Sequence, residues 1–72
     1  MIKNNLSKLM GEKRIKISEL SRLTGLDYKT IFYLYHDKKK GIDFYTLGKI
    51  CWALECTPND LLECTQNEEN RT

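Results

Sequence analysis

Apolar residues recur at helical spacing along nearly the whole 72-residue chain, and no long segment alternates apolar and polar residues with period two. The first apolar stripe predicts a helix from Ile2 to about Lys13, and its members are Ile2, Leu6, Leu9 and Met10. The pattern therefore indicates a helical protein from its first residues onward.

A second, shorter helix is predicted to begin at Ser18, whose hydroxyl group suits the N-cap position. Leu20 faces inward in this helix, and the pattern leaves open whether Leu23 or Thr24 is the next buried residue. Gly25 then interrupts the helix, because glycine adopts the left-handed backbone conformation without steric cost.

A third helix, rich in aromatic residues, is predicted from Tyr28 to about Tyr35, with Asp27 as its N-cap. The polar, lysine-rich segment from His36 to Gly41 predicts a loop. This loop separates the third helix from the remaining apolar stripes.

Two further helices follow the loop. Asp43 can cap the fourth, and Thr57 can cap a short fifth helix that has Pro58 at its first position, where the missing N–H costs nothing. The predicted buried residues of these helices are Leu47, Ile50, Cys51 and Leu54 in the fourth, and Leu61 and Leu62 in the fifth.

These elements predict an all-α domain of five short helices, packed orthogonally because none is long enough for a coiled-coil seam. We expect the domain to span residues 1–64. Residues 65–72 contain no apolar side chain, and we expect them to be a disordered polar tail.

The net charge is only +2, but the charges are unevenly distributed. Residues 1–41 carry ten basic and four acidic side chains, whereas residues 42–72 carry two basic and six acidic ones. A basic first half suits a polyanionic partner such as a nucleic acid.

Several other functions are disfavoured by the residues present. A single histidine, no paired acids placed in a cleft and no glycine-rich phosphate loop argue against an enzyme. Cys51, Cys56 and Cys64 lack metal-site spacing, so we expect three free thiols, with Cys51 in the core, and neither a metal nor a cofactor. No apolar run approaches the ~18–20 residues of a membrane helix, and no secretion signal opens the chain. We therefore expect a cytoplasmic protein with no membrane partner and no small-molecule ligand.

The segment from Ile17 to His36 predicts two helices joined by a sharp turn. The small Ser21 permits a close approach, Gly25 makes the turn, and a hydrophobic wedge holds the pair together, formed by Leu20, Leu26, Ile31 and Leu34. This spacing favours a helix-turn-helix, although any two short helices that meet steeply also need a glycine at the turn.

The third helix carries an unusual outward face. At ~100° per residue, Ile31 and Leu34 lie on one side, and the other side collects Tyr28, Lys29, Phe32, Tyr33 and His36. In a DNA major groove, lysine can donate to guanine, tyrosine hydroxyls can bond phosphates or base edges, and ring edges can contact thymine methyls. The alternative is a hydrophobic patch that binds another protein.

Basic residues flank this helix. Lys38, Lys39 and Lys40 follow its C-terminal end, and Lys16 precedes the second helix. Together with His36, these side chains are the candidates for contacts to DNA phosphates.

Two blocks of the chain resemble one known family. Residues 17–31, ISELSRLTGLDYKTI, and residues 42–62, IDFYTLGKICWALECTPNDLL, are similar to the Cro/phage-repressor (Xre-like) helix-turn-helix family, above all to its short phage and Gram-positive regulators. The likeness covers roughly residues 3–63 and implies a five-helix domain that binds operator DNA, commonly as a dimer. Three positions depart from the family pattern, which often has glutamine at Ile17, leucine at Thr24 and glutamate at Tyr35.

The resemblance also implies roles for individual residues. It implies base contacts by Tyr28, Lys29 and Tyr33, with Phe32 as a further candidate, and phosphate contacts by Lys16, Lys38 and Lys40. We therefore expect a transcriptional regulator, a repressor, that binds specific double-stranded DNA by inserting helix 28–35 into the major groove. The alternative is an antitoxin-like or anti-repressor-like module that uses the aromatic face of the same helix to bind a protein.

Self-association is expected through the fourth helix. Tyr45 and Trp52 lie seven residues apart, on the side opposite Leu47 and Ile50, and they are the candidates for the interface of a homodimer. Packing of Trp52 on the first helix or on the tail would explain its position equally well.

Overall fold

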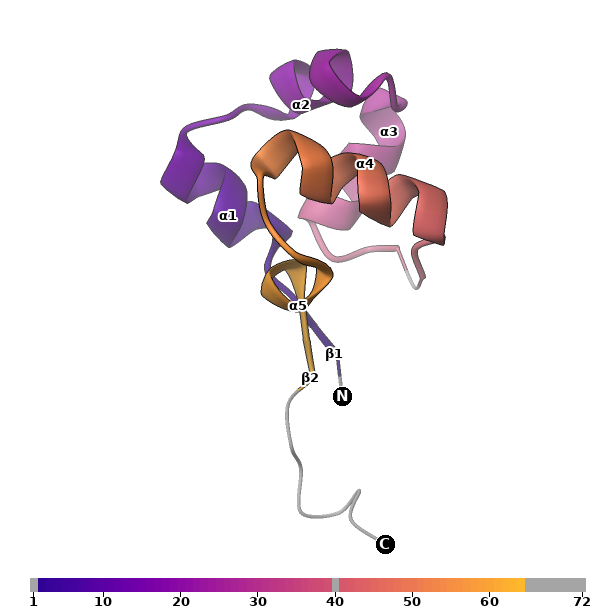
Figure 1. The fold of residues 1–72 in the computed structure, drawn as a ribbon. Coiled ribbons are helices and arrows are strands. Elements are labelled where there is room, and N and C mark those ends of the chain that lie inside the picture. Colours follow the sequence, from indigo (N-terminus) through magenta and orange to yellow (C-terminus); the bar gives the residue numbers. More distant parts are fainter. Residues whose placement is uncertain (1, 40, 65–72) are drawn as a thin grey trace, which may run out of the picture.

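The computed structural model describes residues 2–39 and 41–64. It contains all five predicted helices together with two short strands (Figure 1). Along the chain the elements are β1 (Ile2–Asn4), α1 (Leu6–Lys13), α2 (Ile17–Thr24), α3 (Tyr28–Tyr35), α4 (Phe44–Leu54), α5 (Pro58–Leu61) and β2 (Leu62–Cys64). The predicted five-helix fold is confirmed, whereas the predicted tail lies outside the described residues.

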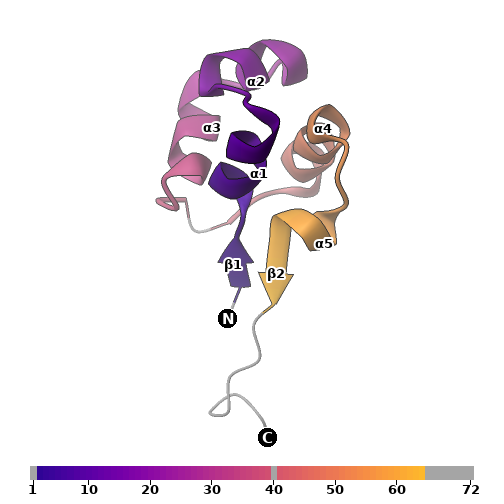
Figure 2. The same ribbon diagram turned by 90° about the vertical axis from the view of Figure 1, so that its left-hand side faces the viewer.

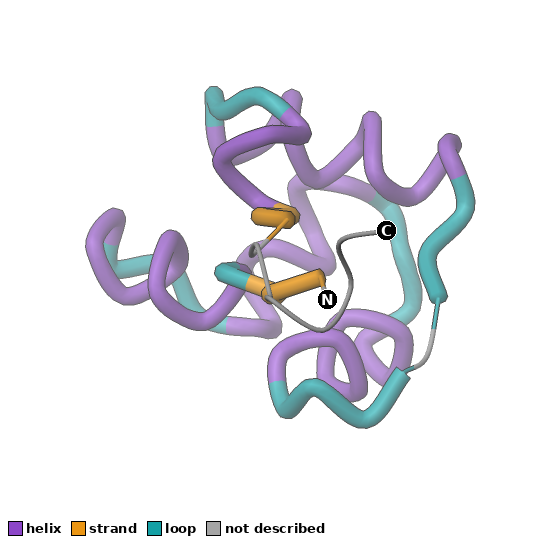
Figure 3. The backbone as a smooth tube through the Cα atoms, turned by 90° about the horizontal axis from the view of Figure 1, so that it is seen from below, coloured by secondary structure: helices purple, strands orange, loops and turns teal. Residues whose placement is uncertain are grey.

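The first helix was expected to include Ile2, and this expectation is wrong. Ile2 is exposed and belongs to β1, which pairs with β2 in an antiparallel register that places Ile2 opposite Cys64. The helix begins only at Leu6 because the side-chain carbonyl of Asn4 accepts the Leu6 N–H at 2.9 Å. Figures 2 and 3 show the two strands side by side, which brings both ends of the domain together. Leu62, expected in the fifth helix, lies in β2 instead.

The starts of the last two helices agree with their predicted caps. The carboxylate of Asp43 accepts the N–H of Thr46 at 3.1 Å. Thr57 and Asp60 form a reciprocal capping box, in which the Thr57 hydroxyl accepts the Asp60 N–H at 3.3 Å and the Asp60 carboxylate accepts the Thr57 N–H at 3.1 Å.

The predicted caps of the second and third helices need correction. The second helix begins at Ile17, so Ser18 lies inside it and the N-cap position belongs to Lys16. The Glu19 carboxylate accepts the Lys16 N–H at 3.4 Å, which satisfies one of the amide groups that a helix start leaves unpaired. Asp27 does occupy the N-cap position of α3, but its side chain forms no capping hydrogen bond.

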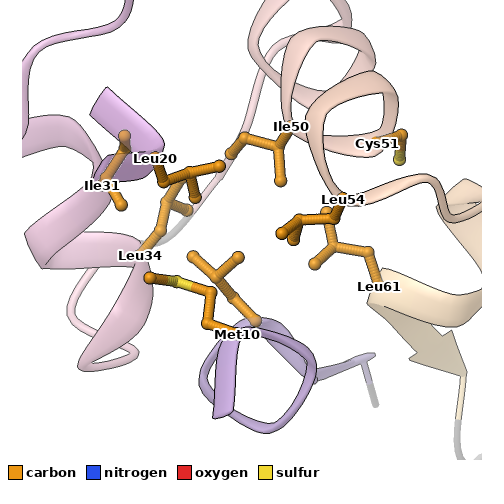
Figure 4. Packing of buried hydrophobic residues seen from close by; sticks show 9 residues of the cluster. Met10, Leu20, Ile31, Leu34, Ile50, Cys51, Leu54 and Leu61 are labelled. Carbon is orange, nitrogen blue, oxygen red and sulfur yellow. The ribbon is translucent and has the colours of Figure 1, made fainter. Parts of the chain in front are cut away.

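Side chains from all five helices converge on one hydrophobic core (Figure 4). Leu20, Ile31, Ile50 and Leu54 are completely buried, and the remaining members are Leu6, Met10, Leu34, Cys51 and Leu61. Leu47, predicted in the buried stripe of α4, is only half-buried. No buried side-chain nitrogen or oxygen within the described residues lacks a hydrogen-bond partner. The core thus fixes the relative orientation of α2 and α3, which carry the candidate site.

Candidate nucleic-acid interface

The turn between α2 and α3 is built on Gly25. This residue has φ of +76°, in the left-handed region, and its N–H donates to the Ser21 carbonyl at 2.8 Å. The Ser21 hydroxyl in turn donates to the carbonyl of Leu26 at 2.6 Å, just beyond the turn. Ser21 therefore ties the last turn of α2 to the segment that leads into α3.

Thr24, and not Leu23, is the second inward residue of α2. Its side chain is buried, and its hydroxyl donates to the Leu20 carbonyl at 2.7 Å while accepting the Leu26 N–H at 3.2 Å. Leu23 is 49% exposed. A threonine at this position thus replaces apolar packing with hydrogen bonds that brace the turn.

The inward side of α3 is anchored firmly. Ile31 has no exposed surface and Leu34 is buried. Both belong to the same hydrophobic core as Leu20 of α2. Asn4 adds a polar anchor, because its side-chain amide donates to the Leu34 carbonyl at 2.6 Å. The opposite side of the helix is consequently held outward.

The outward side of α3 carries the predicted base-contacting residues. Tyr28 and Tyr33 are 49% and 46% exposed, and Lys29 and His36 are also exposed. Phe32 is only half-buried, because it lies between the rings of Tyr28 and His36, whose centroids are 6.2 and 4.4 Å from its own. The three rings follow one another at i, i+4 spacing along the helix.

The lysine segment that follows α3 is attached to the end of this helix by a backbone hydrogen bond. Asp37 has a left-handed backbone with φ of +59°, and the N–H of Lys38 donates to the Tyr33 carbonyl at 2.8 Å. Lys38 and Lys39 are exposed, whereas Lys40 lies outside the described residues. The predicted phosphate-contacting lysine Lys38 is thereby fixed to the last turn of the predicted base-contacting helix.

Lys16 lies at the start of α2 and is exposed. Its N–H is engaged by the Glu19 carboxylate, which places a negative charge beside this candidate phosphate site. The sequence pattern did not indicate that Glu19 would turn back on the helix start. A phosphate at this point would compete with that carboxylate for the backbone amide.

The predicted dimer residues lie on a separate exposed surface of α4. Trp52 is 73% exposed and Tyr45 is 66% exposed, so Trp52 is not buried against α1. Phe44, which the sequence analysis missed, is 90% exposed and lines the same apolar groove. Positions 44, 45, 48 and 52 fall within about 100° of the helical wheel, a signal that could have identified Phe44. We call Phe44, Tyr45, Gly48 and Trp52 the α4 aromatic surface.

The described residues offer neither a metal site nor a membrane-spanning helix. No group of three or more His, Cys, Asp or Glu side chains there could hold a metal ion. No helix among these residues is long and apolar enough to cross a membrane. The cysteines of this part of the chain are free thiols, with Cys51 buried, Cys56 half-buried and Cys64 exposed.

Two helices fixed by a glycine turn, with the second exposing a polar and aromatic side, define a helix-turn-helix domain. Comparison with known proteins agrees with this class. The family model of the Cro/C1-type HTH DNA-binding domain matches residues 5–67, and the chain belongs to this family. Members of the family are generally non-enzymatic proteins that regulate transcription by binding double-stranded DNA.

Two individual proteins are similar to this chain, one in sequence and one in fold. The chain is 34% identical over 65 residues to YozG of Bacillus subtilis (strain 168), described as an uncharacterized HTH-type transcriptional regulator, and the match covers 90% of this chain and 77% of YozG. Its fold is similar to a chain in the structure of the SinR protein/SinI protein complex, with a TM-score of 0.78 and 19% identity. That match covers 90% of this chain and 66% of the other, and at this identity it shows the shared fold alone.

Proposed function

We propose that this protein binds specific double-stranded DNA sites by placing α3 in the major groove. One observation carries the proposal: Tyr28, Lys29 and Tyr33 are exposed on a helix whose opposite side, at Ile31, is completely buried. A lysine in this position can donate to guanine O6 and N7, and tyrosine hydroxyls can reach base edges or phosphates. Phe32, which packs between the Tyr28 and His36 rings, would contribute through the part of its ring that stays exposed.

Phosphate contacts would flank the groove-binding helix. The backbone hydrogen bond from Lys38 to Tyr33 ties the lysine segment to α3, so Lys38 and Lys39 follow the helix toward the DNA backbone. Lys40 and His36 extend this basic segment, and Lys16 supplies a contact at the start of α2. Each phosphate neutralised adds ~0.9 to the slope of log affinity against log salt concentration.

The binding form proposed is a two-fold dimer through the α4 aromatic surface. Phe44, Tyr45 and Trp52 are all largely exposed on one side of α4, and a contiguous exposed apolar patch is typical of a protein–protein interaction site. We expect a two-fold axis there to place the two copies of α3 ~34 Å apart, because successive major grooves on one side of DNA have that spacing. Sedimentation that finds only monomer, with and without bound DNA, would overturn the dimer.

Repression is the proposed outcome of binding. A protein seated in the major groove excludes other proteins from the same base pairs, so it blocks transcription where its operator overlaps the promoter. A reporter gene placed behind the selected operator should fall in expression when the protein is supplied. An increase would show activation instead.

The decisive experiment selects bound sequences from random double-stranded DNA. We expect a two-fold symmetric site, and Lys29→Ala should cost ~1–3 kcal/mol of binding free energy on that site and relax the preference at one position of each half. Lys8→Ala is the matched control, because Lys8 is an exposed lysine on α1, outside the proposed interface. Its loss should leave the base preference unchanged.

Two results would contradict the proposal. Equal effects of the Lys29 and Lys8 substitutions would show that α3 does not read bases. Binding to a protein partner that hardly changes with salt, without any DNA binding, would favour the protein-interaction module.

A further inference from the structure

Two cysteines meet where α4 ends. Glu55 has a left-handed backbone with φ of +53°, its N–H donates to the Trp52 carbonyl at 3.3 Å, and the N–H of Cys56 donates to the Cys51 carbonyl at 3.0 Å. This pair of hydrogen bonds is the Schellman motif, in which the side chains of the two residues joined by the 6→1 bond, here Cys56 and Cys51, commonly contact each other. In this chain both residues are cysteines.

The backbone hydrogen bond limits the separation of the two cysteines. With standard bond lengths, the Cys56 N to Cys51 O distance of 3.0 Å keeps their Cα atoms at most about 7 Å apart. A disulfide usually spans Cα atoms about 4.4–6.8 Å apart. The end of α4 therefore holds the two Cα atoms at about the separation that a disulfide spans, without unfolding the helix.

The thiols differ in their surroundings. Burial, together with the neighbouring Cys56 thiol, raises the pKa of the Cys51 thiol to about 11, so Cys51 stays protonated at neutral pH. Cys56 is half-buried, and both residues line a groove whose other walls include Leu23 and Trp52. Figure 4 shows Cys51 at the edge of the core, on the side of α4 away from Leu20 and Ile31. An oxidant in the groove would thus meet Cys56 first.

We propose that Cys51 and Cys56 are a modification site, a dithiol that hydroperoxides convert to an intramolecular disulfide. The Cys56 thiolate attacks one peroxide oxygen and breaks the O–O bond, which gives a sulfenic acid and, with hydrogen peroxide, one water after protonation. The Cys51 sulfur then attacks the sulfenic sulfur, breaks the S–O bond and releases a second water that carries the Cys51 proton. Two thiols lose two electrons and two protons, and one peroxide becomes two waters.

The test uses the full chain, reduced, freed of reductant and exposed to hydrogen peroxide at neutral pH before remaining thiols are blocked with N-ethylmaleimide. We expect a single chain, not covalently cross-linked to another, that lacks two hydrogen atoms, carries a single N-ethylmaleimide group, and regains its original thiols with dithiothreitol. Cleavage after glutamate separates the cysteines, because Glu55 and Glu63 lie between them along the chain. The disulfide should join the peptide that ends at Glu55 to the peptide that begins at Cys56.

Two variants and an unfolded control sharpen the result. Cys64→Ser should form the same disulfide, whereas Cys56→Ser should form none within the chain. In guanidinium chloride, loop-closure entropy favours the Cys51–Cys56 pair over the Cys56–Cys64 pair by only about twofold, so a much stronger selectivity in the folded chain would come from the fold. Stable sulfenic or higher acids at Cys56, a bond to Cys64, cross-linked dimers or an unreacted pair would each overturn the proposal.

Discussion

Replacing Gly25 with alanine tests the origin of the helix-turn-helix angle. The backbone at Gly25 has φ of +76°, and a Cβ atom added there would meet no other atom within 4 Å. The cost of Gly25→Ala is therefore conformational and not steric. A left-handed backbone costs an L-residue roughly 1–2 kcal/mol, and at such a site this cost exceeds the gain from the smaller entropy of the unfolded alanine chain. We expect a loss of about 1–2 kcal/mol in the free energy of unfolding, a large share of the ~3–5 kcal/mol available to a domain of this size.

The matched control is the same substitution in a right-handed helix. Gly11 lies within α1, where an added Cβ also meets nothing within 4 Å. Gly11→Ala should raise the free energy of unfolding by roughly 0.5–1 kcal/mol, because glycine is a poor helix former. Urea unfolding followed by circular dichroism measures both changes, and each 1 kcal/mol corresponds to about 4–8 °C in Tm.

Opposite signs for the two alanine variants are the diagnostic result. Gly25→Asn should recover part of the loss, because asparagine tolerates the left-handed conformation better than alanine does. A stabilising effect of Gly25→Ala would refute the conformational argument. A loss well above ~3 kcal/mol would refute it as well, since only a steric clash could be so costly, and the open space at Gly25 provides none.

Three further predictions follow from single interactions. Thr24→Val keeps the shape of the buried side chain but leaves the Leu26 N–H without its acceptor, so urea unfolding should show a loss of ~1–3 kcal/mol; an unchanged stability would mean that the hydroxyl does not brace the turn. Lys38→Ala should weaken binding to all DNA sequences alike and reduce the salt slope, measured by fluorescence anisotropy, by ~0.9, whereas an altered base preference would contradict its assignment to a phosphate. Hydrogen bonds from the side chain and backbone of Thr46 hold the pKa of Asp43 below its usual value of 3.8, so this carboxylate stabilises the fold at neutral pH, and that contribution is lost as the pH falls below 3.8 through the lowered pKa. In Asp43→Asn, the free energy of unfolding should fall less steeply as the pH is lowered into the acid range. An unchanged slope there would contradict the capping role.

The helices could be predicted from sequence because their signals are local. The caps at Asp43 and Thr57 and the turn at Gly25 act on backbone groups within four residues, and the predicted ends near Lys13 and Tyr35 are confirmed. The pairing of β1 with β2 depends instead on residues about sixty positions apart, and three-residue strands are too short to show a period. Asn4 illustrates the difficulty, because its side chain bonds both Leu6 nearby and Leu34 far along the chain.

The contents of the candidate site were only partly visible in the sequence. A helical wheel identified the outward side of α3, since it needs only the spacing of the residues. It did not predict that Phe32 would be half-buried, because the packing of its ring between those of Tyr28 and His36 depends on side-chain rotamers. Likewise, the spacing of Cys51 and Cys56 gives no hint of contact, because the left-handed Glu55 that brings them together is not a glycine.

The exposed side of α3 is determined by residues on its other side. Turning the helix about its axis to bury Lys29 would expose Ile31, which has no accessible surface, and exposure of one such side chain costs roughly 1.5–3 kcal/mol. That cost alone is comparable with the whole ~3–5 kcal/mol of stability expected for the domain. The helix therefore presents one side for as long as the protein is folded. It follows that substitutions in the core should weaken DNA binding by lowering the folded fraction while leaving the base preference unchanged, whereas substitutions on the exposed side should change the preference at constant stability.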